Sequence, residues 1–203
     1  MIKTALYCKV KDYDFESLFK KKGYAFFTKG KYNLNIIGVR ASGAQITNSF
    51  DDVIVVVYRT PTGAWTRAIF QVTTDPGLYY CLNPIARKGT AILCPGQYKG
   101  AYGLGKHRGK YLALCQIKPL KVYRDSNKNE VYDYDPNNLE EGMFGINIHK
   151  AGTFSKRIDT WSAGCQVFAS NTEFNNFMTL CKKQVASGCG DTFTYTLIKE
   201  EDL

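Results

Sequence analysis

The residues with the clearest chemical potential are a histidine and a cysteine that lie close together in the chain. His149 ends the apolar run GINIH, which predicts a buried strand, and Cys165 follows sixteen residues later in the sequence SAGC. A cysteine attacks as its thiolate, so a nucleophilic cysteine needs a base or a positive neighbour. Gly164 permits a sharp turn that aims the amides around Cys165 at a developing oxyanion. The pattern predicts Cys165 as nucleophile and His149 as its base, although a histidine beside a buried cysteine is more often structural.

The same segment resembles the signature of the L,D-transpeptidase catalytic domain family. In that signature a strand-borne His is followed, after an intervening loop, by Ser or Thr, a variable or His position, Gly and Cys. His149 and residues 162–165 resemble this pattern. The upstream stretch GTAILCPGQYKGAYGLG, with Pro95-Gly96-Gln97-Tyr98, is similar to the segment that borders the family's substrate groove. The likeness covers about residues 50–170.

The resemblance implies a role for each matched residue. Cys165 would form an acyl-enzyme, and His149 would act first as general base and then as general acid. The backbone amides of Gly164 and Cys165 would bind the oxyanion, and Ser162 would hydrogen-bond within the turn. The residues expected to contact substrate are Gly96, Tyr98, Arg108, Trp161 and Gln166.

Two positions depart from the family pattern. Ala163 stands where many members carry a second His, so this motif offers no Cys-His-His arrangement. After the Cys, many members have an apolar residue and then Arg, whereas here Gln166 follows directly. Gln166, Arg108 and Arg157 are the candidates to take over the contacts of that Arg. The chain is therefore expected to be a divergent relative with a single catalytic histidine.

The family's chemistry implies a substrate and a place of action. The thiolate would attack a carbonyl between an L- and a D-centre of a peptidoglycan stem peptide, and water or an amine would then release the acyl group. We expect hydrolysis, as an endolysin-like L,D-carboxypeptidase or endopeptidase of phage type, rather than transpeptidation. The first 22 residues lack the apolar core of a signal peptide. We therefore expect synthesis in the cytoplasm (the host's, if phage-encoded) and action at the cell wall or periplasm.

Composition constrains the partners. The net charge of +9 favours anionic partners such as cell-envelope polymers. No nucleic-acid-binding motif accompanies this charge, so we expect no nucleic-acid partner. The alternative to catalysis is a basic envelope- or phage-associated binding module that retains the fold.

Seven cysteines without paired spacing predict free thiols, and no apolar run is long enough to predict a membrane span. We expect a monomer.

The elements that position these residues are mainly strands. Runs rich in Val, Ile, Tyr and Thr predict a β-sandwich or barrel of L,D-transpeptidase type, closed by the strand TFTYTLIKE. One long helix follows the cysteine, capped by Asn171 or Thr172 and ended by Gly188. Residues 49–203 form the expected catalytic domain. Residues 1–48 form a small α+β segment, separate or part of the same domain, with a short helix within 12–22.

Other signals are given less weight. His107, in GLGKHRGKY, is expected to be an exposed loop residue among cations. The stretch from Asp125 to Asp133 has oxygen ligands at alternate positions, as in a calcium loop, but Glu130 and Pro136 occupy positions six and twelve. An Asn/Asp-rich hairpin turn is the preferred interpretation. We expect neither a metal nor a cofactor.

Overall fold

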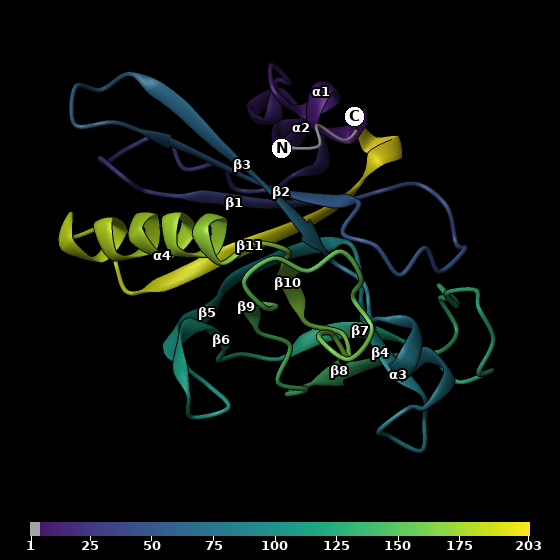
Figure 1. The fold of residues 1–203 in the computed structure, drawn as a ribbon. Coiled ribbons are helices and arrows are strands. Elements are labelled where there is room, and N and C mark those ends of the chain that lie inside the picture. The colour runs from purple at the N-terminus through teal and green to yellow at the C-terminus, as the bar shows by residue number, and fades with distance from the viewer. Residues whose placement is uncertain (1–4) are drawn as a thin grey trace.

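The structure, a computed structural model, describes residues 5–203, and the first four residues of the expected N-terminal segment 1–48 lie outside the described residues. The fold is mainly β. Within the described range, eight strands form a closed barrel and three form a smaller sheet beside it (Figure 1). The barrel strands are, in order, β1 (Asn35–Arg40), β11 (Thr192–Lys199), β5 (Gly96–His107), β6 (Tyr111–Gln116), β9 (Ile148–Lys150), β10 (Gln166–Phe168), β3 (Trp65–Thr73) and β2 (Asp52–Arg59).

Most neighbouring strands are antiparallel, but two pairs are parallel. β1 runs parallel to β11, and β9 runs parallel to β10. A parallel pair cannot be joined by a tight hairpin and needs a longer crossover. Residues 151–165 are that crossover between β9 and β10. They lead the chain back to the same end of the barrel from which β9 started.

Side-chain alternation divides the apolar residues of the strands between two cores. In β2, Ile54 and Val56 belong to the cluster in the barrel interior, whereas Val53, Val55 and Val57 belong to an outer cluster. This division follows from the two-residue period of a strand. Burial of both faces explains why β2 is an almost continuous apolar run.

Two N-terminal helices cover the outer face of β1 and β2. These helices are α1 (Ala5–Val10) and α2 (Phe15–Lys22), and both contribute buried side chains to the outer cluster. Asp14 caps α2 by accepting a hydrogen bond from the Ser17 amide, so the helix expected within residues 12–22 begins at residue 15. Gly23, with φ of 70°, ends it. β1, which also falls within residues 1–48, is a strand of the barrel.

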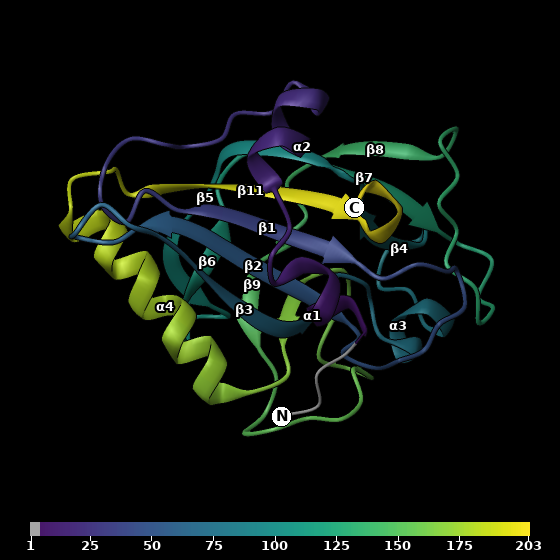
Figure 2. The same cartoon turned by 90° about the horizontal axis from the view of Figure 1, so that it is seen from above.

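The long helix after the cysteine is α4 (Asn171–Ala186), which packs along β3, β9 and β10 (Figure 2). Its N-cap is Ser170 rather than the expected Asn171 or Thr172. Ser170 keeps an extended backbone, and its side chain accepts a hydrogen bond from the Glu173 amide. No helix within residues 5–203 has both the length and the apolar character that a bilayer crossing requires. The apolar face of α4 contains Phe174, Phe177, Met178 and Cys181.

The smaller sheet adjoins the barrel and shares its core. Its strands, in spatial order, are β4 (Thr90–Leu93), β7 (Leu120–Asp125) and β8 (Leu139–Gly142), with the short helix α3 (Leu78–Leu82) preceding β4. Side chains of β4 and β7 belong to the same buried cluster as the barrel interior.

The chain ends in a 3₁₀ turn, η1 (Glu200–Asp202), whose carboxylates pair with Lys9 and Lys22 of the N-terminal helices.

Candidate active site

The parallel pair β9–β10 brings the predicted histidine and cysteine to one face of the barrel wall. Ile148 lies opposite Gln166 and His149 opposite Val167. The Gln166 amide donates to the Asn147 carbonyl at 2.9 Å, so Cys165 lies next to Asn147 at the start of both strands. Ile148 points into the barrel. Alternation therefore places Asn147, His149 and Cys165 on the outer face.

The Cys165 thiol is half-buried and is held by backbone groups. Its Sγ lies 3.4 Å from the Asn147 amide nitrogen and 3.5 Å from the Gly145 carbonyl oxygen. No hydrogen bond joins Sγ to either imidazole within the described chain. Burial raises the pKa of Cys165 to about 11, although the Asn147 amide and the Arg108 charge act to lower it. The sulfur is therefore a thiol at neutral pH.

His149 is oriented by a backbone carbonyl. Its Nδ1 lies 2.9 Å from the Lys150 carbonyl oxygen, and the Tyr111 hydroxyl donates to the same oxygen at 3.2 Å. Because a carbonyl oxygen only accepts, we assign the proton to Nδ1, which leaves the Nε2 lone pair free. Burial first, and then the neighbouring His107, lower the pKa of His149 to about 3. The ring is thus a neutral imidazole with one basic nitrogen.

The second histidine was expected to be an exposed loop residue, and this expectation is wrong. His107 is only 8% exposed, and its ring stacks on that of His149 with centroids 4.0 Å apart. It is the last residue of β5, paired with Tyr111 across the turn formed by residues 108–110. The run GLGKHRGKY continues a strand to its histidine and turns at Arg108-Gly109. That turn signal could have placed His107 on a strand, but not beside His149.

Asn147 links His107 to Cys165. Its side-chain oxygen accepts from the Gln116 amide at 2.9 Å, which fixes the orientation of the carboxamide. Its Nδ2 therefore donates to His107 Nδ1, 3.1 Å away, and the proton of the neutral His107 ring is assigned to Nε2. Its backbone amide contacts Cys165 Sγ. Sequence reasoning missed Asn147, which carries no local signal.

The turn before the cysteine has strict steric requirements. Gly164 adopts φ of 120°, and a side chain there would overlap the carbonyl oxygen of Ala91 in β4. The buried Ser162 hydroxyl donates to the Cys165 carbonyl at 2.8 Å and accepts from the Gly164 amide at 3.2 Å. The Gly164 amide is therefore not free to bind an oxyanion. The Cys165 amide has no hydrogen-bond acceptor among residues 5–203 and remains available.

The residues expected to contact substrate separate into two groups. Arg108 is exposed and lies near enough to influence the pKa values of both Cys165 and His149. Trp161 is 43% exposed and lies on the crossover near Gly152. Arg108 therefore borders the site, and Trp161 lies on the crossover that leads to Cys165.

The other three expected residues are Gly96, Tyr98 and Gln166. Gly96 and Tyr98 lie at the start of β5, whose last residue is His107. The Tyr98 hydroxyl donates to the Cys94 carbonyl at 2.6 Å. Gln166 is fully buried inside the barrel and accepts from Tyr195 at 2.8 Å. The expectation that Gly96, Tyr98 and Gln166 contact substrate stays a prediction.

The calcium-like stretch forms turns rather than an array of ligands. The Asn127 side-chain oxygen accepts from the Asn129 amide at 3.2 Å, and the Asn129 oxygen accepts from Val131 at 2.8 Å. Such contacts define Asx turns. No group of three or more His, Cys, Asp or Glu side chains in residues 5–203 is placed to hold a metal ion.

Comparison of the chain with protein-family models, with curated proteins and with solved structures finds no match. The protein is therefore described by its fold and by the groups at its candidate site. It is a mainly β protein whose barrel wall carries a half-buried thiol, a neutral imidazole and an unengaged backbone amide. The chemistry proposed below follows from the geometry of these three groups.

Proposed function

We propose that the chain is a cysteine-dependent hydrolase of peptidoglycan stem peptides, of the L,D-transpeptidase type in fold and mechanism. The observation that carries the proposal is the orientation of His149. Its Nδ1 is bound to the Lys150 carbonyl, so Nε2 is a free base on the same face as the half-buried Cys165. A neutral thiol and a neutral base are the starting state for general-base-assisted attack.

The proposed reaction begins with transfer of the Cys165 proton to His149 Nε2 as Sγ bonds to the substrate carbonyl carbon. The carbonyl oxygen becomes an oxyanion, and the Cys165 amide donates to it. The tetrahedral intermediate collapses, the C–N bond breaks, and the imidazolium gives its proton to the departing amine. The product is a thioester. Water, deprotonated by His149, then hydrolyses this thioester and restores the thiol; an amine in place of water would give transpeptidation.

Because both groups are neutral before attack, the proposed mechanism transfers the thiol proton during attack rather than starting from a preformed thiolate. The positive charge that forms on His149 is stabilised by the Lys150 carbonyl at 2.9 Å but opposed by burial. A general base is most effective when its pKa lies near the operating pH, so the low pKa of His149 makes this proton transfer energetically costly. In this proposal the protein acts as a monomer at the cell wall or in the periplasm after synthesis in the cytoplasm, and it requires no cofactor.

A second candidate is a basic wall-binding module without catalysis. Its support is the net charge of +9 and the absence of a direct Sγ–imidazole hydrogen bond within the described residues. Such a module would bind anionic envelope polymers in a salt-sensitive way. Wall binding that persists unchanged in Cys165→Ala, without any change in the peptides, would favour this candidate.

The deciding experiment incubates purified peptidoglycan fragments with the protein and identifies the products by mass spectrometry. Loss of a terminal residue, cleavage of a cross-link and exchange of a residue give different masses. We expect hydrolytic products from the wild type and none from Cys165→Ala. Cys115→Ala is the matched control, because Cys115 is also a partly buried free thiol whose pKa is raised by burial. Products that survive Cys165→Ala would overturn the proposal.

A further inference from the structure

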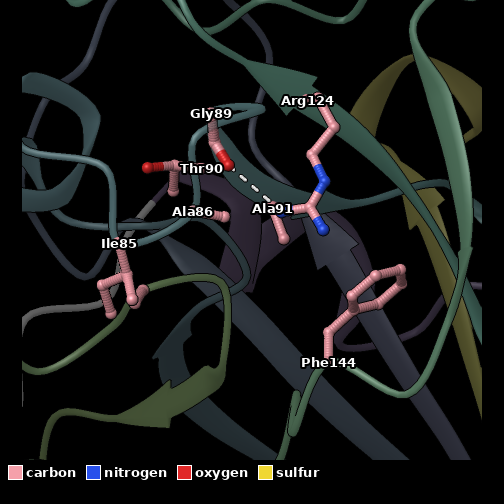
Figure 3. A pocket seen from close by; sticks show the side chains of 8 residues that line it. Ile85, Ala86, Gly89, Thr90, Ala91, Arg124 and Phe144 are labelled. Atoms are coloured by element: carbon pink, nitrogen blue, oxygen red, sulfur yellow. Dashed lines mark hydrogen bonds between the residues drawn. The ribbon is translucent and has the colours of Figure 1, made fainter.

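A cavity of about 230 Å³ adjoins the turn that carries Cys165. Ala163, two residues before the cysteine, forms part of its wall. Phe144 forms another part, and it precedes Gly145, whose carbonyl contacts Sγ. The remaining wall comes from β4, the loop before it and Arg124 of β7 (Figure 3). The cavity therefore adjoins two segments that meet at Cys165, the turn that contains Ala163 and the chain at Phe144-Gly145.

One side chain in the cavity wall is charged. Arg124, on β7, is 8% exposed. Its Nε donates to Glu140 at 2.8 Å, and its Nη1 donates to the Gly89 carbonyl at 3.1 Å. Its Nη2 has no acceptor among the described residues. The guanidinium carbon lies 4.8 Å from the centre of the Phe144 ring, and the two side chains face one another in Figure 3. Arg124 is thus held in one orientation, and its Nη2 group remains able to donate hydrogen bonds to a ligand.

The charges around the cavity leave a net positive site. Its other lining residues carry no charge; they are Ile85, Ala86, Gly89, Thr90, Ala91, Phe144 and Ala163. Glu140, the partner of Arg124, also pairs with the exposed Lys88 at 3.3 Å. Arg124 and Lys88 therefore share the carboxylate of Glu140, which does not line the cavity. A guanidinium that is oriented and partly unpaired matches a carboxylate ligand, to which it donates short, charge-assisted hydrogen bonds.

We infer that this cavity is a subsite that binds the free C-terminal carboxylate of the peptide acted on by Cys165. The inference rests on the proposed function and adds a substrate class to it: acid-terminated rather than amidated peptides. At about 230 Å³ the cavity is smaller than the roughly 300–1,000 Å³ that enclose a whole small-molecule ligand, so it accommodates one end of a peptide. Arg124 binds the carboxylate, and the apolar wall around Phe144 contacts the terminal side chain.

The test measures binding without turnover, in a Cys165→Ala background, by titration calorimetry. The probes are two synthetic stem tetrapeptides that end in D-Ala, one with a free terminal carboxylate and one with a terminal carboxamide. We expect the acid to bind more tightly. Arg124→Gln should weaken binding of the acid by about 10- to 100-fold, the range for a hydrogen bond to a charged group, and change binding of the amide less than about twofold.

Two further variants keep the test interpretable. Lys88→Gln removes a nearby exposed cation that does not line the cavity, and it should leave the preference for the acid intact. Arg124→Lys retains the charge near Glu140 but loses the planar fork, so it should give an intermediate loss even if Arg124→Gln fails to fold. Equal weakening of acid and amide, no weakening of either, or no binding of either peptide would overturn the inference.

The inference and the proposed function fail in distinguishable ways. Acid-selective binding that depends on Arg124, with no turnover by the wild-type protein, would leave the subsite standing and contradict the hydrolase. Turnover that depends on Cys165 but ignores both Arg124 and the terminal carboxylate would leave the hydrolase standing and contradict the subsite.

Discussion

At the scale of single residues, burial determines the protonation of the proposed pair. It raises the pKa of Cys165 to about 11 and lowers that of His149 to about 3. Both groups are neutral across the physiological range, so no thiolate–imidazolium pair exists before substrate arrives. The pH dependence of Cys165 reactivity follows from this.

The first prediction concerns alkylation of Cys165 by iodoacetamide. Only the thiolate reacts, and its fraction rises about tenfold per pH unit below the thiol's pKa. The rate, followed by mass spectrometry of the Cys165 peptide, should therefore climb steadily from pH 6 toward the pKa of about 11. A plateau between about pH 6 and 8 would instead indicate a preformed ion pair and contradict the neutral assignment.

The second prediction concerns His107, which stacks on His149. His107→Phe keeps an aromatic ring in the stack but removes the acceptor for Asn147 and the nearby titratable charge. The pKa of His149, measured by NMR, should move up toward its ordinary value yet stay below it, because burial is the larger cause. Loss of one orienting hydrogen bond should lower turnover about two- to tenfold. An unchanged pKa of His149 would argue against electrostatic coupling of the rings.

At the scale of elements, the site depends on how the crossover between β9 and β10 ends. The turn at residues 162–165 lies against β4, so the smaller sheet constrains the position of Cys165, the proposed nucleophile. Gly164 is the point of closest approach. Its substitution therefore tests whether this contact positions Cys165.

The third prediction compares two glycines with similar backbone conformations. Gly164 has φ of 120° and faces the Ala91 carbonyl, whereas Gly43 has φ of 110° and open space around it. Gly164→Ala should cost about 2–5 kcal/mol of unfolding free energy, from backbone strain and overpacking together, and Gly43→Ala about 1–2 kcal/mol. Urea denaturation measures both. Equal losses would mean that β4 does not constrain the turn.

Much of this layout was predictable from local sequence, because it depends on short-range patterns. A strand at His149, the Gly-Cys turn and the apolar face of α4 follow from periodicity and turn chemistry, although β9 runs from Ile148 to Lys150 and so continues past the histidine instead of ending there. What the sequence could not provide was the pairing of distant strands. His107 reaches His149 from β5, and Arg124 reaches the adjoining cavity from β7; no local signal encodes either position. Gln166 points inward because strand register decides which face is interior, and register is a property of the assembled barrel.

At the scale of the whole molecule, part of the excess positive charge lies at a turn beside the proposed active site. Lys106 and Lys110 are exposed at the turn between β5 and β6, close to His107. Arg108 in the same turn lowers the pKa values of both histidines when charged. We expect this turn to attract anionic polymer toward the proposed active site.

The fourth prediction reverses this charge. Lys106→Glu with Lys110→Glu should weaken binding to an anionic wall polymer several-fold at low salt, and the difference should fade near 1 M salt, where the Debye length is about 3 Å. The matched control makes the same change at the exposed Lys20 and Lys21 of α2. Co-sedimentation with purified walls measures binding. Equal effects of the two pairs would show that only net charge matters and not its location.

The central claim is that Cys165 forms a thioester with His149 as its base, and intact-protein mass spectrometry tests it most directly. The protein is mixed with a stem peptide and quenched in acid within seconds, and the adduct is located by proteolysis. We expect the acyl mass on the Cys165 peptide of the wild type, a strongly reduced yield in His149→Ala, and no adduct in Cys165→Ala. An adduct on another cysteine, or one that forms equally without His149, would contradict the account.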